Sequence, residues 1–141
     1  MSTVQLDHLF VPSHDRIAAA RLLARLLDVP WAEQGVIGPF SPVYVNDGLT
    51  LAFDQWSGPL PRLHFAFRVA PEVFDAVLGR IQDAGLAYRS LPHGPDDHQI
   101  NPAFGGRLIY WSEPDNHVWE LLTVSYERQG GPPPPGTGHG A

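Results

Sequence analysis

The chain contains no cysteine and no lysine among its 141 residues. Without cysteine it can form no disulfide, no thiolate zinc site and no iron–sulfur cluster, and it has no cysteine nucleophile. All its basic residues are arginine, so Schiff-base chemistry, a lysine-anchored pyridoxal cofactor and a Walker phosphate loop are excluded as well. His, Asp, Glu, Tyr and Ser side chains remain available for chemistry.

Positive charge and long apolar runs are also scarce. The nine basic residues are outnumbered by 15 acidic ones, and the net charge is −6, which provides no basic surface for nucleic acid. No run approaches the ~18 apolar residues of a membrane span, and the first residues lack the basic and apolar stretches of a signal peptide. We therefore expect a cytoplasmic protein with a small-molecule substrate that binds neither nucleic acid nor membranes.

The length and composition predict one globular domain. Hydrophobic residues make up 43% of the chain and charged residues 17%, which is enough apolar surface for a core and too little charge for a disordered chain. The length is close to the ~100 to 150 residues of a typical domain. Residues 129–141 are mostly glycine and proline and have almost no apolar side chain. We expect a disordered tail there and a single domain over residues 1–128.

Two parts of this domain repeat one order of elements. The first part begins with an extended apolar run at residues 4–11. A helix is expected over 15–27, capped by Ser13, and two short strands at 43–45 and 49–54. The second part begins with a similar run at 63–69, followed by a helix that Pro71 opens and Gly85 ends. Its short strands are expected at 86–90, 107–111 and 118–124. The repeat predicts an α+β fold of two modules, about 1–57 and 61–126.

Two histidines and one glutamate lie on strands of this pattern. His8 is on the first strand of module one. Because side chains alternate along a strand, Phe65 and Phe67 are expected to pack under the helices while His64 points the other way. Glu120 lies within an apolar last strand, where an ionised carboxylate costs several kcal/mol unless it is paired or bound to a metal.

Taken singly, each of these residues has an ordinary explanation, since a strand histidine is often a hydrogen-bonded core residue and a strand glutamate can face water or an arginine. Taken together, two imidazoles and one carboxylate on equivalent strands of two modules can meet at one point. That set is the facial triad of mononuclear Fe(II) enzymes, which leaves positions open for substrate and oxygen. Zn(II), Mn(II), Co(II) and Ni(II) also fit these ligands, and the spacing does not choose among them.

Three segments resemble the vicinal oxygen chelate superfamily, which includes glyoxalase I, extradiol dioxygenases, fosfomycin-resistance thiol transferases and bleomycin-binding proteins. They are residues 6–11, 63–69 and 110–122. The last contains Glu-Pro-Asp-Asn-His-Val-Trp-Glu-Leu, a slight variant of the family's Asp-Pro-Asp-Gly-His-x-x-Glu-Leu. The resemblance covers nearly the whole chain except the tail. It implies two βαβββ modules whose mixed sheets curl around a metal-binding cavity, with His8, His64 and Glu120 as the ligands.

Glyoxalase I has a fourth protein ligand, a glutamate on the last strand of module one that also acts as the catalytic base. The matching inward positions are expected here at Leu51 or Phe53, with Asp54 on the opposite face. Neither apolar residue can bind a metal. The resemblance therefore favours the extradiol dioxygenases and the fosfomycin enzymes, which use three ligands, over glyoxalase I.

The resemblance also implies two catalytic residues. Tyr110 precedes Glu120 by the offset at which extradiol dioxygenases place an active-site tyrosine, and its hydroxyl could hold a substrate oxygen. These enzymes use a catalytic histidine shortly before that tyrosine. The offset falls near Asn101, and the nearby His98 is our candidate acid or base, with His93 as its alternative. Both can equally be solvent-exposed loop histidines, and His117 is assigned to a turn.

The leading hypothesis is a metal-dependent, dioxygenase-like enzyme that uses Fe(II) on a small aromatic or vicinal-oxygen substrate. The candidates to line its cavity, for most of which core packing is an equal explanation, are Trp56, Trp111, Trp119, Phe10 and Phe104. Two alternatives stay open. One is a non-redox lyase, isomerase or thiol transferase with Mn, Zn, Ni or Co. The other is a bleomycin-resistance-like protein that binds a small molecule without catalysis. Single-domain relatives usually dimerise, sometimes exchanging modules, so we expect a homodimer.

Overall fold

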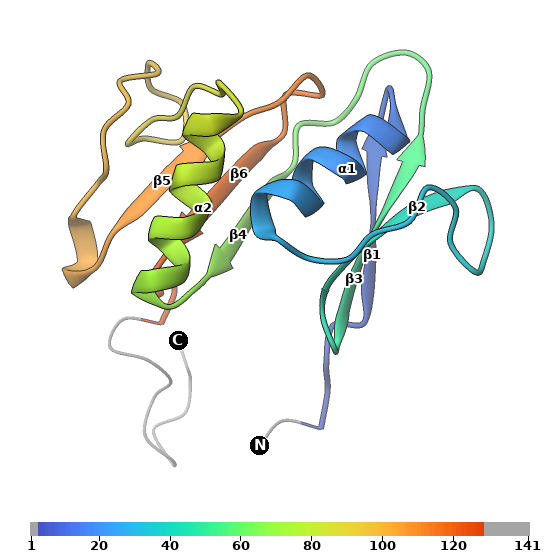
Figure 1. Cartoon of the computed structure of the whole chain (residues 1–141), viewed down its shortest axis with the longest axis horizontal. Coiled ribbons are helices and arrows are strands. Elements are labelled where there is room, and N and C mark those ends of the chain that lie inside the picture. Colours follow the sequence, from blue (N-terminus) through green and yellow to red (C-terminus); the bar gives the residue numbers. More distant parts are fainter. Residues whose placement is uncertain (1–2, 129–141) are drawn as a thin grey trace. The chain divides into compact units, whose positions relative to one another are not determined.

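The computed structural model describes residues 3–128, and the chain divides into two compact units between Arg62 and Leu63. The tail expected at 129–141 lies outside the described residues. Each unit combines one long helix with a sheet of three strands (Figure 1). Among residues 3–128, no helix is long and apolar enough to cross a bilayer.

In the first unit, the last strand in sequence occupies the centre of the sheet. The order of elements is β1 (His8–Ser13), α1 (Arg16–Leu27), β2 (Phe40–Asn46) and β3 (Leu49–Gln55). Strand β3 lies in the centre of the sheet, parallel to β1 and antiparallel to β2. Helix α1 packs on one face of this sheet and buries Ala20, Leu23, Ala24 and Leu26. The helix therefore leaves the other face of the sheet for a site.

The start of α1 differs from the expected one. The side chain of Asp15 accepts a hydrogen bond of 3.1 Å from the backbone N–H of Ala18, and this N-cap contributes about 1 kcal/mol. Ser13 is the buried last residue of β1, and its hydroxyl accepts the N–H of Asp15 at 3.0 Å. The prediction of Ser13 as the cap was wrong because this hydroxyl is used in the connection between strand and helix.

The second unit repeats the first. Its elements are β4 (His64–Arg68), α2 (Pro71–Asp83), a short 3-10 turn η1 (Ala103–Gly105), β5 (Leu108–Trp111) and β6 (Val118–Leu122), with β6 in the centre of the sheet. Helix α2 begins at Pro71 as expected, and Gly85 follows it with a left-handed φ of +70°. The helix buries Phe74, Val77 and Ile81. Val73, in its first turn, is exposed.

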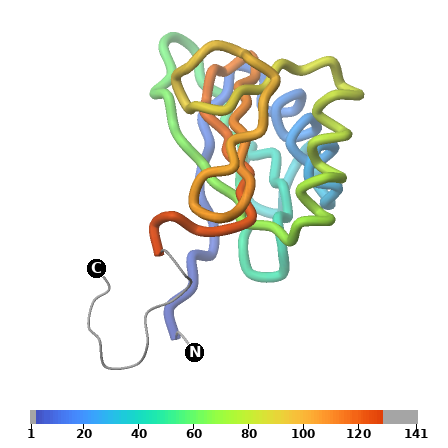
Figure 2. Tube along the Cα trace, turned by 90° about the vertical axis from the view of Figure 1, so that its left-hand side faces the viewer, coloured from blue at the N-terminus to red at the C-terminus, as the bar shows by residue number. Residues whose placement is uncertain are grey.

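The strand expected at residues 86–90 is a single bridge. Only Arg89 pairs with β5, through two backbone hydrogen bonds of 2.9 Å with Tyr110. The carboxylate of Asp97 then accepts the N–H and the hydroxyl of Ser90 at 3.0 and 2.5 Å, which turns the chain out of the sheet. Figure 2 shows the long yellow-to-orange excursion that precedes β5. The first unit has a corresponding bridge at Trp31. In the described residues, the first unit therefore has its three expected strands and one isolated bridge, and the second has three of its four expected strands and two isolated bridges, Arg89–Tyr110 and Asn101–Leu108.

Candidate metal centre

His64 and Glu120 lie side by side on one face of the second sheet. The Nε2 atom of His64 is 2.8 Å from Oε1 of Glu120. Glu120 is fully buried, whereas 41% of the His64 side chain is exposed. Phe65 and Phe67 stack on the ring of Trp119, which alternates with Glu120 along β6. The prediction that His64 points away from the phenylalanines is confirmed, because alternation assigns the two sets to opposite faces.

The two oxygens of the Glu120 carboxylate differ in their hydrogen bonding. Oε1 also accepts a hydrogen bond of 2.9 Å from the hydroxyl of Tyr126. Oε2 is buried and has no hydrogen-bond partner among residues 3–128. A buried acceptor left in this state costs about 1–3 kcal/mol, and more when it is charged. A ligand to this oxygen would remove that cost.

The spacing of the pair also fits a divalent cation. Two ligand atoms at about 2.1 Å from a metal and at right angles to each other lie about 3.0 Å apart. The observed separation between His64 Nε2 and Glu120 Oε1 is 2.8 Å. His64 and Glu120 are therefore close enough to bind one metal through Nε2 and the open oxygen Oε2 after small movements of their side chains.

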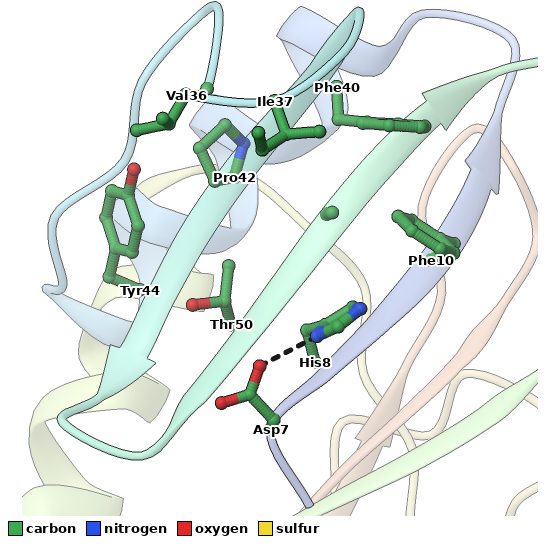
Figure 3. A pocket seen from close by; sticks show the side chains of 11 residues that line it. Asp7, His8, Phe10, Val36, Ile37, Phe40, Pro42, Tyr44 and Thr50 are labelled. Carbon is green, nitrogen blue, oxygen red and sulfur yellow. Dashed lines mark hydrogen bonds and ion pairs between the residues drawn. The ribbon is translucent and has the colours of Figure 1, made fainter.

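His8 is the candidate ligand of the first unit. Its Nδ1 lies 2.8 Å from the carboxylate of Asp7, so Nε2 is the ring nitrogen left for a metal (Figure 3). Metal-binding histidines commonly hold a carboxylate through their second ring nitrogen in this way. Taken by itself, the described part of neither unit gathers three or more His, Asp or Glu side chains at metal-binding distance. The joint ligand set of His8, His64 and Glu120 stays a prediction.

Tyr110 lies on the same face as Glu120, because the two residues are paired across β5 and β6. Its buried ring stands edge-on to the ring of His64, with 6.0 Å between their centroids. Burial, followed by the negative charge of Glu120, raises the pKa of Tyr110 far above its ordinary value. The hydroxyl therefore keeps its proton and can donate a hydrogen bond to a substrate oxygen, but it cannot act as a base near neutral pH. Its catalytic role stays a prediction.

Tyr126 belongs to the same cluster, and sequence reasoning missed it. Burial and the hydrogen bond to Glu120 raise the pKa of Tyr126, so it too acts as a donor. It lies beyond the last strand, and neither alternation nor a motif relates it to Glu120. Only the reversal of the chain after β6 brings the two side chains together.

His98 is not part of this cluster. Its ring packs on the ring of Tyr88 at 4.8 Å, and the hydroxyl of Tyr88 accepts a hydrogen bond of 3.2 Å from Gln82 of α2. Within residues 3–128, no hydrogen bond or ring contact joins His98 to Glu120. His98 and His93 are both exposed. His98 therefore packs on Tyr88, which is hydrogen-bonded to α2. The role of His98 as acid or base stays a prediction.

His117 holds the strand that carries the glutamate. It is fully buried, and its Nδ1 accepts the backbone N–H of Leu63 at 3.1 Å. Its own N–H donates to the carboxylate of Glu113 at 2.9 Å. Between them, Asn116 takes a left-handed φ of +65° at the place of the family's glycine. The turn therefore ties the start of β6 to the start of β4, which places His64 beside β6.

The two sheets have the same register, which identifies equivalent positions. Residue pairs in the first sheet are His8–Thr50 and Phe10–Ala52, and in the second sheet His64–Val118 and Ala66–Glu120. His8 therefore corresponds to His64, and Ala52 corresponds to Glu120. The first unit offers a methyl group at the place where the second has its carboxylate.

The expected positions of the fourth ligand were therefore wrong. Leu51 and Phe53 are buried and alternate with Ala52, so they lie on the face opposite to it. Asp54 shares the face of Ala52, and its carboxylate accepts the indole N–H of Trp56 at 3.1 Å. The error arose because both sides of β3 carry apolar residues, and only pairing with β1 distinguishes them. The expectation that module one lacks a matching glutamate is confirmed.

The face of the first sheet that carries His8 is hollowed into an apolar pocket of about 370 Å³. The rings of Phe10 and Phe40 lie 4.8 Å apart on one side of it. Val36 and Ile37 stand over it from the loop before β2, with 95% and 76% of their surface exposed (Figure 3). This size suits a small molecule. Of the residues expected to line the cavity, Phe10 lines this pocket, whereas Trp111 and Trp119 are buried in the core.

No protein-family profile and no curated protein matches the chain. Among solved structures, the oxidase ChaP-H1 is 40% identical with a TM-score of 0.81, over 92% of this chain and 100% of its own. The oxidase ChaP-H2 is 38% identical with a TM-score of 0.82, over 89% of this chain and 97% of its own.

A more distant structure shares the fold. It is the fosfomycin resistance protein FosX from Mesorhizobium loti, 23% identical with a TM-score of 0.59, over 89% of this chain and 95% of its own. The two repeated units have matching strand registers, and two relatives cover nearly the whole chain. The chain belongs to the vicinal oxygen chelate superfamily.

Proposed function

We propose that this chain is a metal-dependent oxygenase, dioxygenase-like in its chemistry, that chelates vicinal oxygens of a small aromatic substrate. His8, His64 and Glu120 would hold the metal, with Fe(II) favoured. The observation that carries the proposal is the buried carboxylate of Glu120, which keeps one oxygen without a partner beside the Nε2 atom of His64. The identity of 38 to 40% with two oxidases supports oxidation as the reaction class.

A divalent metal at these ligands would supply a Lewis acid that favours loss of the substrate hydroxyl proton, with open positions for oxygen. The protein contributes orientation. Asp7 holds Nδ1 of His8 and so directs Nε2 outward, and Tyr110 can donate its hydroxyl proton to a substrate oxygen. Phe10 and Phe40 offer ring surfaces on which an aromatic substrate can pack.

Oxygen consumption tests the reaction class. The purified chain loaded anaerobically with Fe(II) is expected to consume oxygen when a panel of catechols and related vicinal diols is added. The same chain loaded with Zn(II) is the matched control and is expected to consume none, because Zn(II) has no redox chemistry. An oxygen electrode follows the uptake. No oxygen uptake by the Fe(II) form with any compound of the panel would contradict the dioxygenase proposal.

Two other functions are tested by the same preparations. The ligand set does not select iron, so a Zn(II)- or Mn(II)-loaded chain that catalyses thiol addition, isomerisation or hydrolysis would make the enzyme a non-redox one. The pocket of the first unit is formed by that unit's residues alone, which favours small-molecule binding as the third candidate. Tight ligand binding by a chain that takes up no metal would identify a binding protein without catalysis.

We also propose that the protein is a homodimer. Strands β1 and β4 are edge strands of their sheets, and exposed edges favour pairing with a further strand. Light scattering is expected to give a mass near twice the 15.5 kDa of the chain, and a monomer mass would contradict it. Co-expression of His8→Ala and Glu120→Ala chains then locates the site. Metal binding recovered in the mixture assigns these two ligands to different chains, and its absence assigns them to one chain.

A further inference from the structure

The position of Tyr126 requires a sharp reversal of the chain. Residues six apart on a straight strand are about 20 Å apart, yet the hydroxyl of Tyr126 is 2.9 Å from Oε1 of Glu120. Strand β6 ends at Leu122, and the backbone N–H and side-chain hydroxyl of Thr123 bond to the backbone of Arg107, both at 3.0 Å. The red segment after this anchor turns away from the strand direction (Figure 2).

The ring of Tyr126 is held on the face of the sheet that carries Glu120. It packs against the buried cluster formed by Leu108, Tyr110, Val118 and Leu122. The ring of Phe104 lies over it, with 5.1 Å between the two centroids. Contacts on both sides restrict the side chain. The hydroxyl is therefore held in place by packing rather than by its hydrogen bond alone.

This contact gives the two oxygens of Glu120 different roles. Oε1 accepts the hydroxyl of Tyr126 and also lies 2.8 Å from Nε2 of His64, while Oε2 has no hydrogen-bond partner among the described residues. A carboxylate held at one oxygen cannot turn freely, so the direction of the other oxygen is set as well. Partners of this kind around a metal ligand typically change metal affinity by 10- to 100-fold when they are removed.

We propose that Tyr126 is a positioning residue for Glu120: its hydroxyl holds Oε1 and so orients the carboxylate for a divalent cation shared with His64. The inference rests on the proposed function, because it takes Glu120 to be a metal ligand. It adds the segment after β6 to the site. The segment thereby acts on metal affinity without supplying a ligand.

Removing one hydroxyl tests this directly. In Tyr126→Phe the ring and its packing remain, so the metal-free variant is expected to melt within about 2 °C of the wild type. Its Mn(II) dissociation constant, measured from the electron paramagnetic resonance signal of free Mn(II), is expected to rise about 10- to 100-fold. The visible spectrum of the Co(II) form is also expected to change, because the orientation of one ligand changes.

Tyr88→Phe is the matched control. Tyr88 is a buried tyrosine of the same unit whose hydroxyl is hydrogen-bonded to Gln82 and not to Glu120. Its Mn(II) affinity is expected to stay within twofold of the wild type. An equal loss of affinity in both variants would overturn the proposal, because the effect would then not be specific to Glu120.

The outcomes separate this inference from the proposed function. If the wild type binds Mn(II), His64→Ala does not, and Tyr126→Phe binds as tightly as the wild type, the role of Tyr126 is overturned and the metal site stands. If the wild type binds neither Mn(II) nor Co(II), or His64→Ala binds as well as the wild type, both proposals are overturned.

Discussion

The His64→Ala variant is expected to show no rise in melting temperature when Fe(II), Mn(II), Co(II), Zn(II) or Ni(II) is added. The wild type at a metal concentration 100 times its dissociation constant should gain about 2.7 kcal/mol. At about 2 to 8 °C per kcal/mol, that gain is a shift of several degrees. The variant loses it because the imidazole beside Glu120 supplies a ligand that no neighbouring side chain can replace. Differential scanning fluorimetry under anaerobic conditions measures both shifts.

His117→Ala is the matched histidine control, and its expected result is the reverse. This ring is fully buried and accepts the N–H of Leu63, so its removal leaves a cavity and a backbone donor without its acceptor. We expect a loss of about 2–4 kcal/mol in the metal-free protein, with the metal-induced shift retained. Removal of His64 takes away one of the two partners of Oε1 of the buried Glu120 carboxylate, so metal-free stability should fall by about 1–3 kcal/mol, and the two variants are separated by their metal-induced shifts. An unchanged metal shift in His64→Ala would show that the site is assigned wrongly.

Glu120→Leu is expected to raise the stability of the metal-free protein while abolishing its response to metal. Leucine has a similar volume and removes a buried carboxylate that keeps one oxygen without a partner. Replacement of buried ionic groups by apolar ones is often neutral or stabilising, by about 1–4 kcal/mol. The donors left behind are on His64 and Tyr126, which are not fully buried and can bind water, and on the buried Tyr110, whose hydroxyl keeps its bond to that of Tyr126.

Opposite effects of one substitution on stability and on metal binding distinguish a ligand from a structural residue. Urea unfolding of metal-free wild type and variant, with and without added Mn(II), gives both quantities. Tyr88→Phe, at a hydroxyl that bonds to Gln82 and not to Glu120, is the control, and its metal response should stay that of the wild type. If Glu120→Leu instead destabilises the metal-free protein by more than about 1 kcal/mol, then the carboxylate serves mainly as an acceptor for His64 and Tyr126.

The two units share a register but differ in chemistry. At equivalent positions the second unit has Glu120 and the first has Ala52. The partner of Glu120 across its antiparallel strand is Tyr110, whereas the partner of Ala52 is Pro42. The carboxylate and the tyrosine thus belong to one sheet, and an apolar pocket with one histidine belongs to the other. Under the proposed function, the first unit would contribute His8 and an apolar surface for the substrate, and the second would contribute His64 and Glu120.

Regular elements were predicted from the sequence where the signal was local. Helix α2 begins at Pro71 and is followed by Gly85 as expected, because both residues act on their own backbone. The prediction of a strand at 86–90 was wrong because the conformation of this segment depends on Asp97. The carboxylate of Asp97 accepts the hydrogen bonds of Ser90 that a neighbouring strand would otherwise accept. The prediction of which β3 side chains point toward the site was wrong because both faces of this strand are apolar.

The sequence by itself determined which chemistry is possible and which side chains share a strand face. The absence of cysteine and lysine leaves histidine and carboxylate as metal ligands, and alternation along a strand separates His64 from the phenylalanines beside it. These properties depend on residue type and on neighbours along the chain. The tertiary structure alone decided that Ala52 corresponds to Glu120 and that Tyr126 reaches the carboxylate, because both follow from strand register and from a chain reversal. Such contacts join residues that no local pattern relates.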